Sequence, residues 1–195
     1  KFDAIGLRED SGLNILKNQF GLNGKVVLDP TLLLDDYREL VSSPSEERAE
    51  LVSFRLVNDD RYLAYLAPIS RQLGLIPVLL NRRRYTPGFK YRPFIGIKGW
   101  LNSIATASFV VTDSFHCMVF SILFRKNFVV IPSHPERTTR MTGLLSRLGL
   151  GERFFSDISM VDINLLKPIS YNDVFKRLEE ERSKSMEFLI NAING

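Results

Sequence analysis

Three side chains able to do chemistry stand together in one short segment, Asp113, Ser114 and His116. The apolar run 109–111 precedes them, and the residues after them are apolar at helical spacing, which predicts a buried strand, a sharp turn and a helix. In an open α/β sheet such a turn lies at the carboxyl edge, where ligands bind, and the new helix directs free N–H groups at a ligand. An anion is favoured there. A neutral His116 facing that crevice can take or give a proton.

The same residues also have a purely structural interpretation. Asp113 or Ser114 can cap the helix, and a histidine in a first turn is often only held in place by a hydrogen bond. Cys117 is predicted to lie in the core. Adjacent helical residues point about 100° apart, so Cys117 and His116 would not pair as nucleophile and base. The sequence by itself leaves both interpretations of Asp113 and His116 open.

The composition predicts a globular protein of one or at most two domains. The 195 residues are 45% hydrophobic and 25% charged, with a net charge of +4, and this length can bury a proper core. Basic residues are scattered apart from Arg82–Arg84, so we expect no nucleic-acid partner. A single cysteine excludes an intrachain disulfide framework, and with two histidines it builds no familiar zinc site, so we expect no metal.

The chain shows no signal peptide and no apolar run of the roughly 20 residues that cross a bilayer, so we expect a soluble protein. It begins with Lys1 rather than methionine and enters a strand-like segment at once. We therefore expect further sequence upstream of Lys1.

Strand-like and helix-like segments alternate along the chain, which predicts an α/β fold with a parallel sheet. The polar stretch 41–48 looks like a linker, and a βαβαβ core is predicted over 49–131. The stretch 81–92 is interpreted as a basic loop at a strand end. Predicted strands are 2–7, 25–28, 49–56, 76–80, 109–111 and 127–131, and predicted helices are 13–20, 59–73, 99–105, 115–124, 141–150 and 171–193.

Several arginines are predicted to follow strand ends. Arg8 comes after the first strand, and its alternative interpretation is a surface arginine paired with Glu9 or Asp10. Arg137 and Arg140 lie in the polar loop after the strand 127–131. His134, between two prolines in that loop, is interpreted as structural or exposed. The chain contains no Walker loop, no Gly-x-Gly-x-x-Gly and no Gly-x-Ser-x-Gly, so the usual nucleotide and hydrolase motifs are absent.

Taken together, these motifs resemble the polysaccharide pyruvyl transferase family. The strongest segment is 110–124 around Asp113 and His116, and 100–107 resembles its usual lead-in. The segments 2–9 with Gly12, 27–34, and Arg140 with 144–150 follow in the family's order, so the resemblance covers essentially the whole chain. Ser114 stands where some relatives have arginine, and Cys117 where many have glycine.

The resemblance implies a glycosyltransferase-B-like architecture of two Rossmann-like domains with the active site between them. Residues 1–48 would be the end of the N-terminal domain with its linker, and 49–195 the C-terminal domain with an amphipathic C-terminal helix. Most of the first domain would be missing, so we expect this chain to be inactive alone. The resemblance also implies that phosphoenolpyruvate gives its pyruvyl group to a sugar of a bacterial surface polysaccharide, which forms a ketal and releases phosphate.

The resemblance suggests a role for each candidate residue. His116 would transfer protons, with Asp113 orienting it or acting on the sugar hydroxyl. Arg8, Arg140, Arg137 and Ser114 would bind substrate, because forked guanidinium groups suit carboxylate and phosphate. Phosphoenolpyruvate is the donor substrate and no cofactor is expected.

The acceptor would be a sugar or a lipid-linked oligosaccharide, with the enzyme cytoplasmic or peripherally associated with the inner face of the membrane. The alternatives are a glycosyltransferase that uses a nucleotide-sugar and a non-catalytic glycan-binding or assembly module.

Overall fold

The computed structural model describes residues 3–41, 47–57, 60–82, 84–134 and 138–194. Contacts within the chain group it into two units. The smaller comprises Lys1–Asp35, Glu136–Gly151 and Ser170–Gly195, and the larger comprises Asp36–Pro135 and Glu152–Ile169. The expected domains 1–48 and 49–195 stay a prediction about the whole protein.

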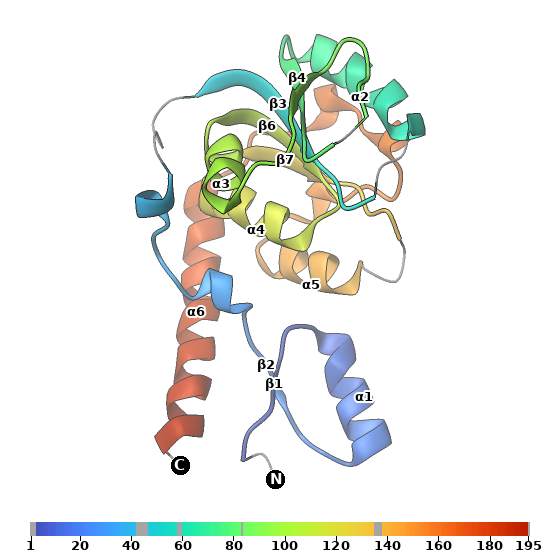
Figure 1. Cartoon of the computed structure of the whole chain (residues 1–195). Helices are drawn as coiled ribbons and strands as arrows, with labels where there is room; N and C mark the ends of the chain where they lie inside the picture. Colours follow the sequence, from blue (N-terminus) through green and yellow to red (C-terminus); the bar gives the residue numbers. More distant parts are fainter. Residues whose placement is uncertain (1–2, 42–46, 58–59, 83, 135–137, 195) are drawn as a thin grey trace. The chain divides into compact units, whose positions relative to one another are not determined.

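Among the described residues of the larger unit, five parallel strands form one sheet in the order β5-β4-β3-β6-β7 (Figure 1). The strands are β3 (Arg48–Phe54), β4 (Ile76–Leu80), β5 (Lys90–Arg92), β6 (Ala107–Thr112) and β7 (Asn127–Val130). β4, β6 and β7 contain continuous apolar runs, because both faces of a parallel sheet are covered. The predicted α/β, Rossmann-like fold class is confirmed.

Helices cover the two faces of this sheet. Leu63, Leu66 and Ile69 of α2 (Asp60–Gln72) pack into one core with alternate strand residues such as Leu51 and Val111. The other face meets α3 (Ile97–Ala105) and α4 (Phe115–Leu123). There the ring of Trp100 contacts those of Phe54 and Phe120 edge to face.

One strand was not predicted. Residues 90–92 form β5 beside β4, within the stretch interpreted as a basic loop. The strand is short, lies at the edge of the sheet and carries charged residues at both ends, as edge strands often do. One of these charged residues forms a long-range ion pair, in which Arg92 Nη2 lies 2.6 Å from a carboxylate oxygen of Glu50 in β3. The order of elements is therefore βαββαβαβ rather than βαβαβ.

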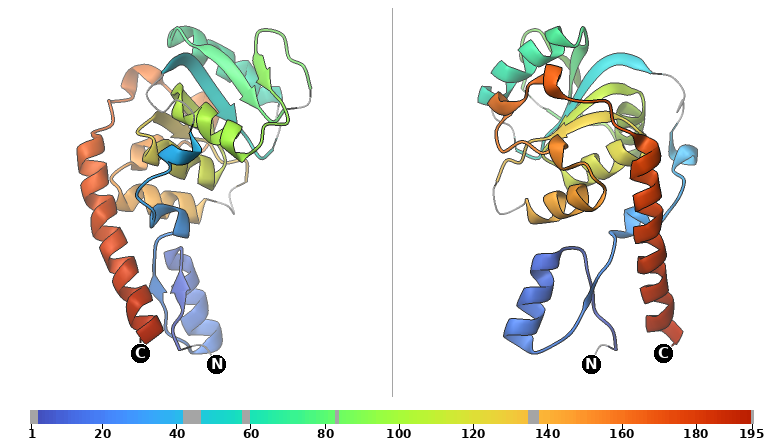
Figure 2. Two further views of the ribbon diagram at one scale, coloured as in Figure 1. Left: turned by 60° about the vertical axis from the view of Figure 1, so that its left-hand side comes forward. Right: turned by 180° about the vertical axis from the view of Figure 1, so that it is seen from behind.

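The described residues of the smaller unit form three helices and a pair of very short strands. The strands β1 (Gly6–Leu7) and β2 (Lys25–Val26) are parallel, and α1 (Asp10–Phe20) connects them. The 3₁₀ turn η1 (Pro30–Leu32) follows β2. From the second half of the chain come α5 (Thr139–Arg147) and the long α6 (Tyr171–Asn194), which is red in both views of Figure 2. The predicted C-terminal helix is confirmed almost residue for residue.

Buried Arg182 fastens α6 to the segment after β2. Its Nε and Nη2 donate to the carbonyls of Leu32 and Leu34, at 2.6 and 3.0 Å, and its Nη1 lies 2.7 Å from Asp35. One turn further along, the Ser185 hydroxyl accepts the N–H of Leu28 at 3.0 Å.

None of the helices in the described parts of the chain is long and apolar enough to span a membrane.

Candidate active site

The order of the strands creates a switch point between β3 and β6. From β3 the chain continues to β4 on one side, whereas from β6 it continues to β7 on the other. In open sheets of this kind, ligands bind at the carboxyl edge beside such a switch point. Phe54 and Thr112 are paired at the ends of these strands, so Arg55 and Asp113 come next on either side of the switch point.

Asp113 ties the loop after β3 to the turn after β6. Its side chain is only 1% exposed, and its carboxylate accepts the N–H of Leu56 at 2.7 Å and that of Val57 at 3.3 Å. The hydroxyl of Ser133, after β7, also donates to it. A carboxylate has about four acceptor positions, so these donors use most of its capacity.

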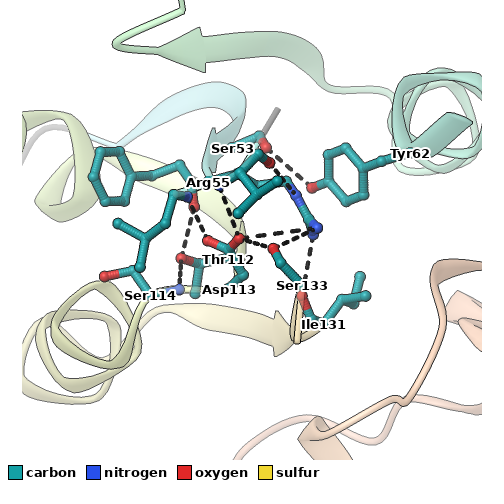
Figure 3. Close-up of polar contacts among 11 residues, drawn as sticks. Ser53, Arg55, Tyr62, Thr112, Asp113, Ser114, Ile131 and Ser133 are labelled. Carbon is teal, nitrogen blue, oxygen red and sulfur yellow. Dashed lines mark hydrogen bonds and ion pairs between the residues drawn. The ribbon is translucent and has the colours of Figure 1, made fainter. Parts of the chain in front are cut away.

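Arg55 completes this network (Figure 3). Its Nη2 donates to the Ser133 hydroxyl at 3.0 Å and lies 3.9 Å from Asp113, while Nη1 donates to the carbonyl of Ile131 at 3.1 Å. The guanidinium also lies over the ring of Tyr62, 4.1 Å from its centre. Arg55, Asp113 and Ser133 therefore join the ends of three strands, and we call them the edge network.

The turn into α4 has its own hydrogen bonds. Thr112 donates its hydroxyl to the carbonyl of Phe54 at 2.7 Å and accepts the N–H of Ser114 at 3.0 Å. Of the two predicted caps, the structure uses Ser114, whose hydroxyl accepts the N–H of Cys117 at 3.4 Å. Asp113 instead faces the loop after β3.

His116 is the exposed residue in an otherwise buried stretch. The residues of α4 from Phe115 to Ile122 are buried apart from this one. A helix that is apolar on every side belongs to a core. A solvent-facing imidazole in its first turn is therefore better explained by a binding or catalytic role than by packing. Its ring lies edge to face with Phe115, with 5.5 Å between the ring centres.

Cys117 is a core residue, as predicted. It is fully buried, and burial raises the pKa of its thiol to about 12. The neutral thiol is the stable form at physiological pH, which removes Cys117 as a nucleophile.

In the smaller unit, Arg8 pairs with a buried carboxylate. Its Nη1 donates to Asp29 at 2.7 Å, so its ion pair is with Asp29 rather than with the neighbouring acids. Asp29 also accepts the N–H and hydroxyl of Thr31, at 3.1 and 2.7 Å, and so caps the 3₁₀ turn η1. The pair holds Arg8 in place although almost half of its side chain is exposed.

Arg140 lies in the electrostatic field of the same cluster. Partial burial lowers its pKa, and the positive charge of Arg8 lowers it further, against the opposite effect of Asp29 and Glu9. The hydroxyls of Thr139 and Ser11 donate to Glu9, and these bonds lower the pKa of that carboxyl. Arg8 and Arg140 are therefore close enough for their charges to interact.

The predicted site residues thus fall into two groups. Asp113, Ser114 and His116 lie at the switch point of the larger unit, and Arg8 and Arg140 lie together in the smaller unit. Arg137 falls outside the described residues. In the part of the chain that the structure describes, no cluster of three histidine, cysteine or acidic residues could hold a metal.

Sequence reasoning missed Arg55, Ser133 and Tyr62. Arg55 carried a usable signal, because it directly follows an apolar strand in the same way that Asp113 does. Its bonds to residues after β7 depend on the strand order, which the sequence does not state.

Comparison with known proteins gave a family match and matches to solved structures. The family model for polysaccharide pyruvyl transferases matches residues 1–135, which include Arg8 and the turn at 113–116 and end before Arg140. No curated protein matches the sequence. A solved structure described as the glycotransferase of kitacinnamycin is similar, with a TM-score of 0.50 and 16% identity over 74% of this chain and 41% of that one.

That structural likeness bears on the fold alone, and this chain spans less than half of the solved structure's length. It agrees with a glycosyltransferase-like arrangement of the parallel sheet and its helices. The family match is more specific, since it runs through β1, the whole parallel sheet and the turn that carries His116. The chain belongs to the polysaccharide pyruvyl transferase family.

Proposed function

We propose that this protein transfers the pyruvyl group of phosphoenolpyruvate to two hydroxyls of a sugar in a bacterial surface polysaccharide. The observation that carries the proposal is the exposed His116 in the first turn of buried α4, inside the segment that matches the family. The acceptor is proposed to be a polysaccharide sugar or a lipid-linked oligosaccharide, reached from the cytoplasm or at the inner face of the membrane.

The reaction balances without a redox partner. One sugar hydroxyl adds through oxygen to C2 of phosphoenolpyruvate, and a proton adds to C3, which turns the vinyl CH₂ into a methyl group. A second hydroxyl then forms a bond to C2 while the C2–O bond to phosphate breaks, and its proton leaves with the phosphate. No electrons are gained or lost overall, so the proposal needs no cofactor.

His116 is proposed to move the protons. A neutral imidazole accepts a proton at one nitrogen and carries a proton on the other, so one side chain can serve both the hydroxyl and the vinyl carbon. Its exposure keeps it within reach of substrate, and the edge network supports this role by fixing the backbone at the start of α4.

The contacts of Asp113 favour a positioning role over direct action on the sugar. Its carboxylate accepts two backbone N–H groups and a serine hydroxyl and is almost wholly buried. We propose that it holds the turn that presents His116. Ser114 is proposed to contribute through the capped N-terminus of α4, whose first-turn N–H groups favour an anion.

Arg8 and Arg140 are proposed to bind the donor. Phosphoenolpyruvate carries a carboxylate and a phosphate, both suited to forked guanidinium groups. The pKa of Arg140 is lowered mainly by burial and further by the charge of Arg8, so the two guanidinium groups are close enough to interact with one anion, which supports the proposal. Arg137 is kept as a further donor-binding candidate.

Product analysis tests the function. The full-length protein is incubated with phosphoenolpyruvate and pyruvylatable glycosides, and NMR is used to follow a new ketal methyl signal together with released phosphate. Equal amounts of ketal and phosphate support the proposal. Consumption of a nucleotide-sugar in a parallel reaction would favour the glycosyltransferase alternative, and glycan binding with neither reaction would favour the non-catalytic module.

A further inference from the structure

A groove of about 390 Å³ in the larger unit has no part in the site described above. It lies between the first turns of α2 and the loop that joins β4 to β5. Most of its lining is apolar or aromatic, with one carboxylate and one guanidinium, which is typical of small-molecule sites. The lining residues are Asp60, Leu63, Ala64, Arg84, Tyr85, Thr86, Pro87 and Phe89.

Tyr85 is exposed yet held in place. Three quarters of the residue faces solvent, but its ring stacks on that of Tyr91 with 5.6 Å between the centres and 28° between the planes. The Tyr91 hydroxyl donates to the carbonyl of Thr86 at 2.9 Å and accepts its N–H, which anchors the loop. Gly88, with φ of +82°, follows Pro87 in a turn that favours glycine. A ring fixed in this way loses little further freedom when a ligand stacks on it.

The polar groups of the groove are also oriented. One oxygen of Asp60 accepts a bond from Arg82 at 2.6 Å, and the other accepts one from Arg84 at 3.1 Å. The side chains of Asp60 and Arg84 remain 66% and 79% exposed. Each carboxylate oxygen has a second acceptor position, and a guanidinium has five N–H groups. An oriented acceptor beside an oriented donor suits the neighbouring hydroxyls of a sugar.

We propose that this groove is a subsite for a neutral sugar ring of the acceptor glycan, with the ring stacked on Tyr85. This inference rests on the proposed function, because it names where part of that acceptor binds. The face of an aromatic ring is negative and attracts the positive C–H bonds of a pyranose. The lining carries one negative and one positive charge, so a neutral sugar fits it better than a phosphorylated ligand does.

The position of the groove agrees with this role. Leu63 lines both the groove and a small cavity that Arg55 also lines. The groove therefore neighbours the edge network, at the same edge of the sheet as the turn that carries His116. A glycan chain with one residue in the groove would be held beside the switch point of its own unit.

Saturation-transfer NMR on the full-length protein tests the subsite, with lactose, cellobiose and maltose as probes and uridine diphosphate as the competing ligand. We expect at least one disaccharide to receive saturation from the protein. Tyr85→Ala should weaken its binding about tenfold, and Tyr85→Phe should keep it. Tyr65→Ala is the matched control, since Tyr65 is an exposed tyrosine of α2 outside the groove.

Three results would overturn the assignment: no binding of any disaccharide, equal binding by Tyr85→Ala, or loss of uridine diphosphate binding alone in that variant. Pyruvyl transfer is measured separately on the same proteins. Tyr85-dependent sugar binding without transfer would remove the proposed function and leave the subsite standing. Transfer with an unchanged acceptor Michaelis constant in Tyr85→Ala would remove the subsite and leave the function standing.

Discussion

Arg55 and Asp113 follow the ends of adjacent strands, and their charged groups lie 3.9 Å apart with the Ser133 hydroxyl bonded to both. Arg55 and Asp113 are far apart in the sequence. Their meeting depends on β3 and β6 being neighbours in the sheet, which is also what creates the switch point. The contact that holds the turn before α4 is therefore a consequence of the topology.

Arg55→Ala should lower the free energy of unfolding by about 1–3 kcal/mol, because it leaves the Ile131 carbonyl without this donor and the buried Asp113 carboxylate without the positive charge beside it. Arg55→Lys should recover only part of this loss, since a single ammonium cannot replace a planar fork. Urea denaturation gives both values. Arg84→Ala, at an exposed ion pair, is the control and should change the free energy by less than about 1 kcal/mol. An Arg55→Ala protein as stable as wild type would show that the edge network does not hold the turn.

Cys117 should resist alkylation in the folded protein. Its pKa of about 12 keeps the thiol protonated at pH 8, and the side chain is fully buried. Mass spectrometry after iodoacetamide treatment should find the native chain unlabelled and the chain in guanidinium labelled. The raised pKa also predicts that the contribution of Cys117 to the free energy of unfolding is fully present below the unfolded pKa of about 9 and is lost as the pH rises toward 12. Rapid labelling of the native protein at pH 8 would contradict this burial.

Arg182→Ala should destabilise the smaller unit by about 1–3 kcal/mol, because two backbone carbonyls lose their donor in a buried place. The control is Lys184→Ala on the same helix, where the side chain is 62% exposed. Hydrogen exchange is the more specific readout, and we expect faster exchange of the amides at 28–34 in the Arg182 variant only. Unchanged protection there would mean that α6 is held to this segment by other contacts.

Arg8→Lys and Arg140→Lys should each raise the donor Michaelis constant of the full-length enzyme with little change in melting temperature. The charge is kept, but the fork that matches carboxylate and phosphate is lost. Steady-state kinetics over a range of phosphoenolpyruvate concentrations measures this. Lys17→Arg, on α1, is the control, because it exchanges lysine and arginine at a position outside the proposed donor site. Donor Michaelis constants equal to wild type in both variants would remove the two arginines from the donor site.

The sequence predicted those parts of the molecule that local pattern determines. Continuous apolar runs identified β4 and β7, and α1 and α2 end within one residue of their predicted ends, each before a glycine with positive φ. The turn from β6 into α4 was predicted with His116 in its first turn. These features depend on neighbours in the chain.

Features that depend on partners far along the chain were missed. From the sequence, residues 90–92 resemble a charged loop, because the pairing of Arg92 with Glu50 depends on the fold. Likewise, the sequence makes Asp113 a plausible helix cap, whereas in the structure it accepts two N–H groups from the loop after β3. Side chains such as Arg55 and Asp29 have partners that only the order of the strands and the path of the chain determine.

The central claim is that His116 transfers protons, and its most direct test is the turnover of His116→Ala in the full-length enzyme, measured as phosphate released with ketal formed. The chain's other histidine gives the matched control, His134→Ala. The account predicts that His116→Ala lowers turnover by a factor on the order of a hundred or more, with an unchanged melting temperature, while His134→Ala stays close to wild type. Turnover near the wild-type rate in His116→Ala would contradict it.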